Sequence, residues 1–252
     1  QSAIYYEGSG WFGQLSAINS GALYKAKFAE PMEEIIAGYS IDPQNESISL
    51  GSGWNWIGFM STQVMSIENA LSSLNLSELD YIKSQFSSSV YYEGYGWFGS
   101  LEYLRPGEGY MIRLSNSDQL VYPEITAKKT SVSNLTNDDD KYINRADYQY
   151  SGSLTGKLFM NGFVAGSAND TLFAYVDGEC RGYAPAMYFT PLDEFVFHIL
   201  ISSNKLEGEE VHFKYYSSTL DTTLQLVETV EFENDMFLAN AYSAFKFDLN
   251  SI

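Results

Sequence analysis

The sequence predicts a mainly β protein, in which a repeat module with a mixed sheet and one short helix precedes an immunoglobulin-like β-sandwich. Three observations carry this prediction. Aromatic residues make up 16% of the 252 residues, and such residues favour the pleated, half-buried surface of a sheet. A nine-residue motif occurs twice in one register, which indicates an internal repeat. The second half consists of short apolar runs separated by turn signals, as in β-sandwiches.

The repeated motif reads YYEGSGWFG at residues 5–13 and YYEGYGWFG at residues 91–99. Each residue of the first copy lies 86 positions before its counterpart, and the register continues without a gap to Tyr24 and Tyr110. The first copy has no counterpart of the segment that precedes residue 87. We therefore describe residues 1–50 as a half copy and residues 51–123 as a full copy of one module.

The half copy is expected to contain two strands. Apolar and aromatic residues favour strands, and they are frequent in Ile4 to Glu7 and in Leu23 to Phe28. A glycine-rich loop lies between these two segments. The segment from Glu33 to Tyr39 could form either a helix or a strand. Asp42-Pro43-Gln44-Asn45 is a turn signal.

The full copy opens with an expected hairpin and the one convincing helix. Ser47 to Leu50 and Trp54 to Phe59 are predicted to pair across Gly51-Ser52-Gly53. Ser66 is a suitable N-cap residue for the helix. Helical spacing places four apolar residues on one stripe, which should cover a face of the sheet: Ile67, Ala70, Leu71 and Leu74. Further strands are expected at Tyr81–Lys83, Tyr110–Leu114 and Leu120–Tyr122, with a turn at Arg105–Gly109.

The domain boundary is placed in a polar stretch. Residues 1–126 form the repeat domain, residues 127–141 the linker and residues 142–252 the β-sandwich domain. The linker contains the acidic run Asp138, Asp139 and Asp140. A solvated linker explains this run well; a weak Ca²⁺ site is the alternative, because hard cations bind clustered carboxylates. No other cofactor or metal site is expected.

The sandwich domain carries two type I′ hairpin signals, at Asn161-Gly162 and at Asp177-Gly178. The continuous apolar run Phe195 to Ser202 predicts a central strand that is buried on both faces. Residues 211–215 alternate in polarity, so one face of that strand should be exposed. Leu224–Phe232 and Ala244–Leu249 complete about seven strands in an immunoglobulin-like layout.

Composition argues against several classes of partner. The net charge is −18, which disfavours nucleic acid, anionic membranes and anionic glycans. No apolar run reaches the roughly 18 residues of a membrane-spanning helix.

Cys180 is the only cysteine; it is either a small buried side chain or a thiol that pairs between chains. A chain that opens at Gln1 is typical of a processed, exported protein.

No arrangement of residues predicts catalysis. The motif matches the dinucleotide fingerprint Gly-x-Gly-x-x-Gly, but no helix can follow its last glycine. His198 lies in an apolar strand, where a hydrogen-bonded core histidine is the simplest interpretation, and His212 should point outward. Glu209 and Glu210 are adjacent on a strand, so their carboxylates point to opposite faces. We therefore expect no enzyme activity.

Several segments follow one another in an order that resembles a known module: GWNWIG at 53–58, ALSSL at 70–74, YIKSQ at 81–85, GYGWFG at 94–99 and PGEGY at 106–110. The module is common in large secreted and surface proteins of bacteria that use the type IX export route. The second half is similar to the sandwich that often follows it, through LFAYVDGECRG at 172–182 and EEVHFKYY at 209–216. The resemblance implies an extracellular, non-enzymatic, adhesive or structural protein.

The candidate binding residues are all aromatic and lie in the first half: Tyr5, Tyr6, Trp11, Trp54, Trp56 and Trp97. The tryptophans could instead form the core of the module. The incomplete first copy suggests an open strand edge that is completed within the chain or by a neighbouring subunit. We therefore expect a structural or adhesive protein, secreted or at the cell surface, that could assemble with itself into a fibre or surface layer. A carbohydrate-binding module of a secreted adhesin is the alternative.

Overall fold

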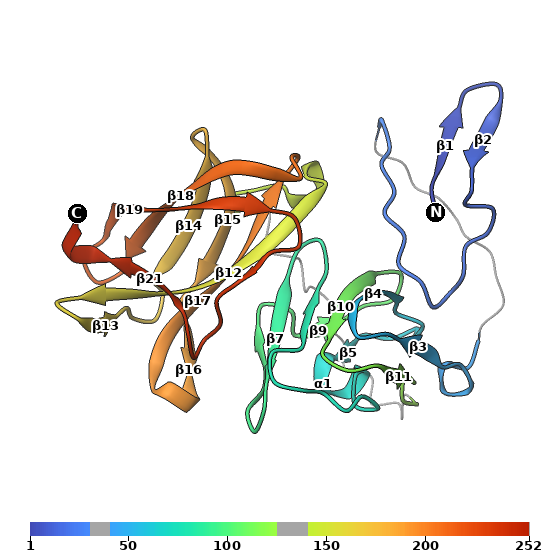
Figure 1. Ribbon diagram of the computed structural model, residues 1–252, viewed down its shortest axis with the longest axis horizontal. Coiled ribbons are helices and arrows are strands. Elements are labelled where there is room, and N and C mark those ends of the chain that lie inside the picture. Colours follow the sequence, from blue (N-terminus) through green and yellow to red (C-terminus); the bar gives the residue numbers. More distant parts are fainter. Residues whose placement is uncertain (31–40, 125–140, 252) are drawn as a thin grey trace. The chain divides into compact units, whose positions relative to one another are not determined.

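The computed structural model describes residues 1–30, 41–124 and 141–251 (Figure 1). These residues form a mainly β protein, as the sequence predicted. Two compact units are present: Gln1–Asn75 with Tyr103–Lys128, called unit 1, and Leu76–Glu102 with Lys129–Ile252, called unit 2. The sequence pattern instead groups residues 76–102 with the repeat module. Apart from residue 141, the predicted linker and its candidate Ca²⁺ ligands Asp138, Asp139 and Asp140 lie outside the described residues.

Unit 1 is built from short antiparallel strand pairs, β1–β2, β3–β11, β4–β10 and β5–β9. Its elements are β1 (Ala3–Tyr6), β2 (Gly10–Gly13), η1 (Pro43–Asn45), β3 (Ile48–Leu50), β4 (Gly53–Gly58), β5 (Met65–Ser66), α1 (Ile67–Ala70), β9 (Tyr103–Leu104), β10 (Gly109–Leu114) and β11 (Asp118–Leu120).

The expected helix is present but shorter than its apolar stripe. The Ser66 hydroxyl accepts a hydrogen bond from the N–H of Asn69, which confirms the predicted N-cap. Regular α-helix ends after one turn, and residues 71–74 continue as turns. The four residues of the stripe are all buried, as helical spacing predicted: Ile67, Ala70, Leu71 and Leu74.

Two sequence predictions in unit 1 are wrong. The hairpin across residues 51–53 does not form, because β3 pairs with β11 and β4 pairs with β10. The Asn55 side chain instead closes this loop through hydrogen bonds with both backbone groups of Gly51. The expected strand at Leu23–Phe28 is also absent. Its counterpart β10 pairs with β4, and residues 1–30 contain no counterpart of β4.

Unit 2 contains all the longer strands. Its elements are β6 (Tyr81–Lys83), β7 (Ser88–Tyr92), β8 (Gly96–Gly99), η3 (Arg145–Asp147), β12 (Tyr150–Met160), β13 (Phe163–Ala165), β14 (Thr171–Val176), β15 (Glu179–Pro185), β16 (Met187–Phe189), η4 (Thr190–Leu192), β17 (Glu194–Ser203), β18 (Glu207–Ser217), β19 (Thr222–Glu233), β20 (Phe237–Leu238), β21 (Phe245–Asp248) and η5 (Leu249–Ser251).

The sandwich consists of two sheets, with strand orders β13-β12-β17-β16 and β15-β14-β18-β19 (Figure 1). In immunoglobulin terms, β12, β17 and β16 correspond to strands B, E and D, and β15, β14, β18 and β19 to C′, C, F and G. The C-terminal strands β20 and β21 pair in parallel with β12, in place of an N-terminal strand A. Residues 239–244 form the loop between them.

The structure confirms the two type I′ turns and the buried central strand that the sequence predicted for the sandwich. Asn161 and Asp177 have φ of 52° and 50°, and the glycines that follow them also have positive φ, as a type I′ turn requires. The eight residues from Val196 to Ser203 at the centre of the first sheet are all buried. Residues of both sheets meet in one apolar core that includes Leu154, Phe197, Phe213, Phe232 and Phe247.

Candidate assembly site

The two copies of the repeated motif fold into the same antiparallel hairpin. Hairpin 1 is defined here as residues 2–15 and hairpin 2 as residues 88–101. The pairing register is the same, with Tyr5 opposite Trp11 in one and Tyr91 opposite Trp97 in the other. The ring centroids of these pairs are 5.4 Å and 5.5 Å apart. The repeat in sequence is therefore a repeat in structure.

The glycines of the motif have a structural role in both copies. Gly13 and Gly99 have φ of 149° and 150°, where glycine is favoured. A Cβ atom at Gly13 would lie 2.1 Å from the carbonyl oxygen of Ser2, and one at Gly99 would lie 2.2 Å from that of Ser88. Each of these oxygens accepts hydrogen bonds from the two N–H groups that follow the glycine. The motif is a close-packed hairpin, in agreement with the rejection of a nucleotide-binding loop.

Hairpin 2 is packed against the sandwich. Tyr92 is fully buried and Phe98 is 3% exposed. Both rings contact Phe189 at the end of β16, with centroids 4.9 Å and 5.0 Å from its ring. The hydroxyl of Tyr92 accepts a 2.8 Å hydrogen bond from the N–H of Ala241, in the loop between β20 and β21. This loop and Phe189 form the docking surface for hairpin 2.

The segment before hairpin 2 is anchored by an ion pair between a buried lysine and a partly exposed aspartate. Lys83 of β6 is 3% exposed, and its Nζ lies 2.6 Å from Oδ1 of Asp235. The same ammonium group donates to the carbonyl oxygen and the hydroxyl of Ser151 at 2.7 and 3.1 Å. All three ammonium hydrogens therefore have an acceptor. Gln85 adds hydrogen bonds to the backbone oxygens of Arg145 and Tyr148.

A buried histidine lies under the same segment. His198 of β17 has Thr155 Oγ1 at 3.0 Å from Nδ1 and Ser88 Oγ at 2.9 Å from Nε2. Burial lowers the pKa of His198 to about 4, so the ring is neutral at pH 7. This confirms the expected core histidine. One face of β17 lies in the core of the sandwich. Residues 76–102 cover its other face, through contacts such as those of Tyr81 and Ser88 with His198. Both faces are therefore buried, which explains the continuous apolar run.

Hairpin 1 presents the same side chains to solvent. Tyr6, the counterpart of Tyr92, is 55% exposed, and Phe12, the counterpart of Phe98, is 56% exposed. Trp11 on the other face is 68% exposed, and Ile4 and Tyr5 are also exposed. A two-stranded hairpin with both faces in water is marginally stable by itself. The exposed aromatic faces therefore mark this hairpin as a candidate interaction surface.

The outer edge of β1 is open as well. In hairpin 2, the N–H of Tyr91 donates to Asp80 O at 2.8 Å, and Tyr91 O accepts from the N–H of Leu79 at 2.9 Å. Within the described residues, β1 pairs only with β2. The backbone groups of Tyr5, the counterpart of Tyr91, therefore face an unfilled strand position.

The other candidate tryptophans are partly exposed. Trp54 and Trp56 lie on one face of β4, and Trp97 is half-buried in hairpin 2. Trp56 is 46% exposed. The alternative that the tryptophans form the core of the module is wrong, because strand alternation directs Ile57 to the core and the indoles away from it. Lys25 lies over the Trp56 ring, with Nζ 5.2 Å from the centroid.

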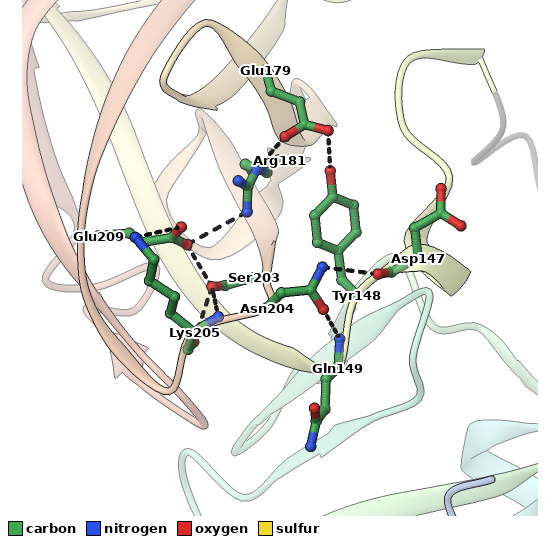
Figure 2. A network of polar contacts seen from close by, with 9 residues as sticks. All are labelled: Asp147, Tyr148, Gln149, Glu179, Arg181, Ser203, Asn204, Lys205 and Glu209. Carbon is green, nitrogen blue, oxygen red and sulfur yellow. Dashed lines mark hydrogen bonds and ion pairs between the residues drawn. The ribbon is translucent and has the colours of Figure 1, made fainter. Parts of the chain in front are cut away.

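A polar network ties the start of the sandwich to its second sheet (Figure 2). Glu209 of β18 is 7% exposed. Its Oε2 accepts from Ser203 Oγ at 2.5 Å and from Arg181 Nη1 at 3.5 Å. Arg181 also pairs with Glu179, whose other oxygen accepts from the hydroxyl of Tyr148 at 2.8 Å. The buried carboxylate is paired within the fold, which is the arrangement of a structural group.

Three further titratable groups of the sandwich differ in their exposure. Glu210, next to Glu209, is exposed, so the two carboxylates point to opposite faces as predicted. His212 also points outward. Cys180 is half-buried, and burial raises the pKa of its thiol. No group of three or more metal-binding side chains occurs within the described ranges. Nor does a helix in those ranges combine the length and apolar character needed to cross a membrane.

Comparison with known proteins gives no relative. No family model, no curated protein and no solved structure matches the chain.

Proposed function

We propose that this protein is a non-catalytic, extracellular structural or adhesive protein that assembles by strand complementation, with hairpin 1 as the acceptor. The exposure of hairpin 1 carries the proposal. The same hairpin, in the same register and with the same ring pairs, is buried where a partner surface is available. Exposed strand edges with apolar side chains pair readily with another chain.

The assembly proposal also rests on the geometry of the edge. Strand addition needs unpaired backbone groups along a straight edge, and side-chain faces that can be covered. Hairpin 1 offers both, through the outward backbone of Tyr5 and the exposed rings of Tyr6 and Phe12. A contact of this kind between identical chains is head-to-tail, so it produces a fibre or layer unless it closes into a ring. The cell-surface setting is inferred from the resemblance described above.

The test compares assembly of the wild-type chain with that of Tyr5→Pro. Proline removes the outward N–H of β1 while the hydrogen bonds to β2 stay available. Tyr5→Phe is the matched control, because it keeps the backbone donor. We expect the size of wild type and Tyr5→Phe to grow with concentration in light scattering, with fibres or sheets in electron micrographs, and Tyr5→Pro to stay monomeric. A wild-type monomer at every concentration would refute self-assembly.

Glycan binding is the second candidate, because Trp54 and Trp56 lie side by side on one strand face. Flat indole rings can stack on sugars. However, Arg113 and Lys25 lie over these two rings, in the space that a sugar would need. The test is titration with neutral oligosaccharides, followed by tryptophan fluorescence. Binding that Trp56→Ala abolishes and Trp11→Ala leaves unchanged would favour this function.

A further inference from the structure

The internal repeat also defines what kind of strand completes hairpin 1. In hairpin 2 the position beside β7 is filled by β6, which pairs with it in antiparallel register. Tyr81 lies opposite Val90, Ile82 opposite Ser89 and Lys83 opposite Ser88. In the first copy, the counterparts of Val90, Ser89 and Ser88 are Ile4, Ala3 and Ser2.

The segment before β6 makes further contacts to the hairpin backbone. The carboxylate of Glu78 accepts a 2.7 Å hydrogen bond from the N–H of Glu93. The N–H of Leu79 donates a hydrogen bond to the carbonyl oxygen of Tyr91, and the carbonyl oxygen of Asp80 accepts one from the N–H of Tyr91. Residues 78–83 therefore follow the hairpin edge along its length. The corresponding groups of hairpin 1 are the N–H of Glu7 and both backbone groups of Tyr5.

The side chains of β6 are buried within unit 2. Tyr81, Ile82 and Lys83 are each at most 3% exposed. Hairpin 1 shares the pairing register, the glycine geometry and the ring pairs of hairpin 2. No strand of this type occupies the β1 edge within the described residues.

We propose that hairpin 1 binds an antiparallel strand of the β6 type that comes from outside residues 1–252. Its sequence has the form Glu-Leu-Asp-Tyr-Ile-Lys, with Tyr opposite Ile4, Ile opposite Ala3, and Glu on the N–H of Glu7. This inference rests on the proposed strand complementation, and it specifies the partner. The chain's own β6 is held by Asp235 and Ser151, so the bound strand is a further one.

The probe is a dye-labelled peptide with the sequence of residues 77–86, SELDYIKSQF, added to the full-length chain. We expect saturable binding by fluorescence polarisation. Hydrogen exchange should show new protection in residues 1–12. Tyr5→Pro should weaken binding at least about tenfold, because a backbone hydrogen bond and the strand fit are lost together. Tyr5→Phe should bind like wild type. A peptide with proline in place of the isoleucine, and one with a scrambled sequence, should not bind.

The result separates this inference from self-assembly. Peptide binding by a chain that stays monomeric would support the β6-type partner and refute self-assembly. Assembly of a chain that does not bind the peptide would refute the partner and leave assembly through another surface. Binding that Tyr5→Pro leaves unchanged would also overturn the inference, since the peptide would then occupy another edge, such as that of β7.

Discussion

Tyr6 and Tyr92 occupy the same position in two copies of one hairpin, yet Tyr92 is fully buried and Tyr6 is 55% exposed. The backbone around them is the same, with ring partners Phe12 and Phe98 at 5.7 and 6.2 Å. The difference lies in what covers them. Phe189 and the Ala241 loop cover Tyr92, and no surface among the described residues covers Tyr6 in this way.

Truncating the two tyrosines should therefore have very different effects on stability. Tyr92→Ala removes a buried ring and leaves the N–H of Ala241 without its acceptor. The free energy of unfolding of unit 2 should therefore fall by about 3–5 kcal/mol. Tyr6→Ala removes a ring from solvent and should change stability by less than about 0.5 kcal/mol. Chemical denaturation of the monomeric chain measures both. Equal effects would mean that Tyr6 is covered in solution.

The Lys83–Asp235 ion pair should be a major anchor of residues 76–102. Asp235→Leu leaves the buried ammonium of Lys83 without its counter-charge, and should cost about 3 kcal/mol of stability. Lys83→Met should cost a similar amount. The double variant Lys83→Met with Asp235→Leu should cost less than the sum, by about 1–3 kcal/mol.

The control for this pair is Lys246→Met, because Lys246 carries an exposed charge in the same unit. Replacement of an exposed side chain usually changes stability by less than about 0.5 kcal/mol. The measurement is denaturant unfolding of all four variants. Additive effects of Lys83→Met and Asp235→Leu would show that the two side chains do not act as a pair.

His198 should make unit 2 sensitive to mild acid. Its folded-state pKa of about 4 lies below the value of about 6.5 in an unfolded chain. Between these two pH values the unfolded chain binds more protons than the folded one. The free energy of unfolding therefore has its full value above pH 6.5 and falls as the pH drops towards 4. The loss should reach roughly 3 kcal/mol, since each pKa unit corresponds to about 1.4 kcal/mol.

Replacement of the histidine tests this expectation. In His198→Gln, the stability measured by denaturation should depend less steeply on pH between 4 and 6.5 than in the wild type. His212→Gln is the matched control, because it removes the exposed imidazole. An unchanged pH slope in His198→Gln would show that carboxylates alone govern the acid sensitivity.

Features that depend on a few neighbouring residues could be predicted from the sequence. The two type I′ turns follow from Asn161 and Asp177, which tolerate positive φ before a glycine. Ser66 caps its helix because the acceptor and the N–H of Asn69 are three residues apart. The candidate site was found in the same way, since the repeat at residues 5–13 and 91–99 can be read from one sequence.

Features that depend on distant partners could not be predicted. A strand at Leu23–Phe28 was expected from its composition, but a strand needs a neighbour, and only the second copy supplies one, in β4. The contact between Lys83 and Asp235 joins residues 152 positions apart. For the same reason, the sequence could not show that residues 76–102 pack on the sandwich, or that the first hairpin is exposed and the second buried.

Glu209 and Glu210 provide a last test, because they are adjacent carboxylates in opposite surroundings. Glu209 pairs with Arg181, whose side chain is only 11% exposed, and accepts from Ser203. Glu209→Gln removes the more buried of the two carboxylate charges beside this arginine, and should cost about 2–3 kcal/mol in denaturant unfolding. Glu210→Gln changes an exposed group and should stay within about 0.5 kcal/mol of wild type. A Glu209→Gln variant of wild-type stability would show that the charge of Glu209 does not stabilise the fold.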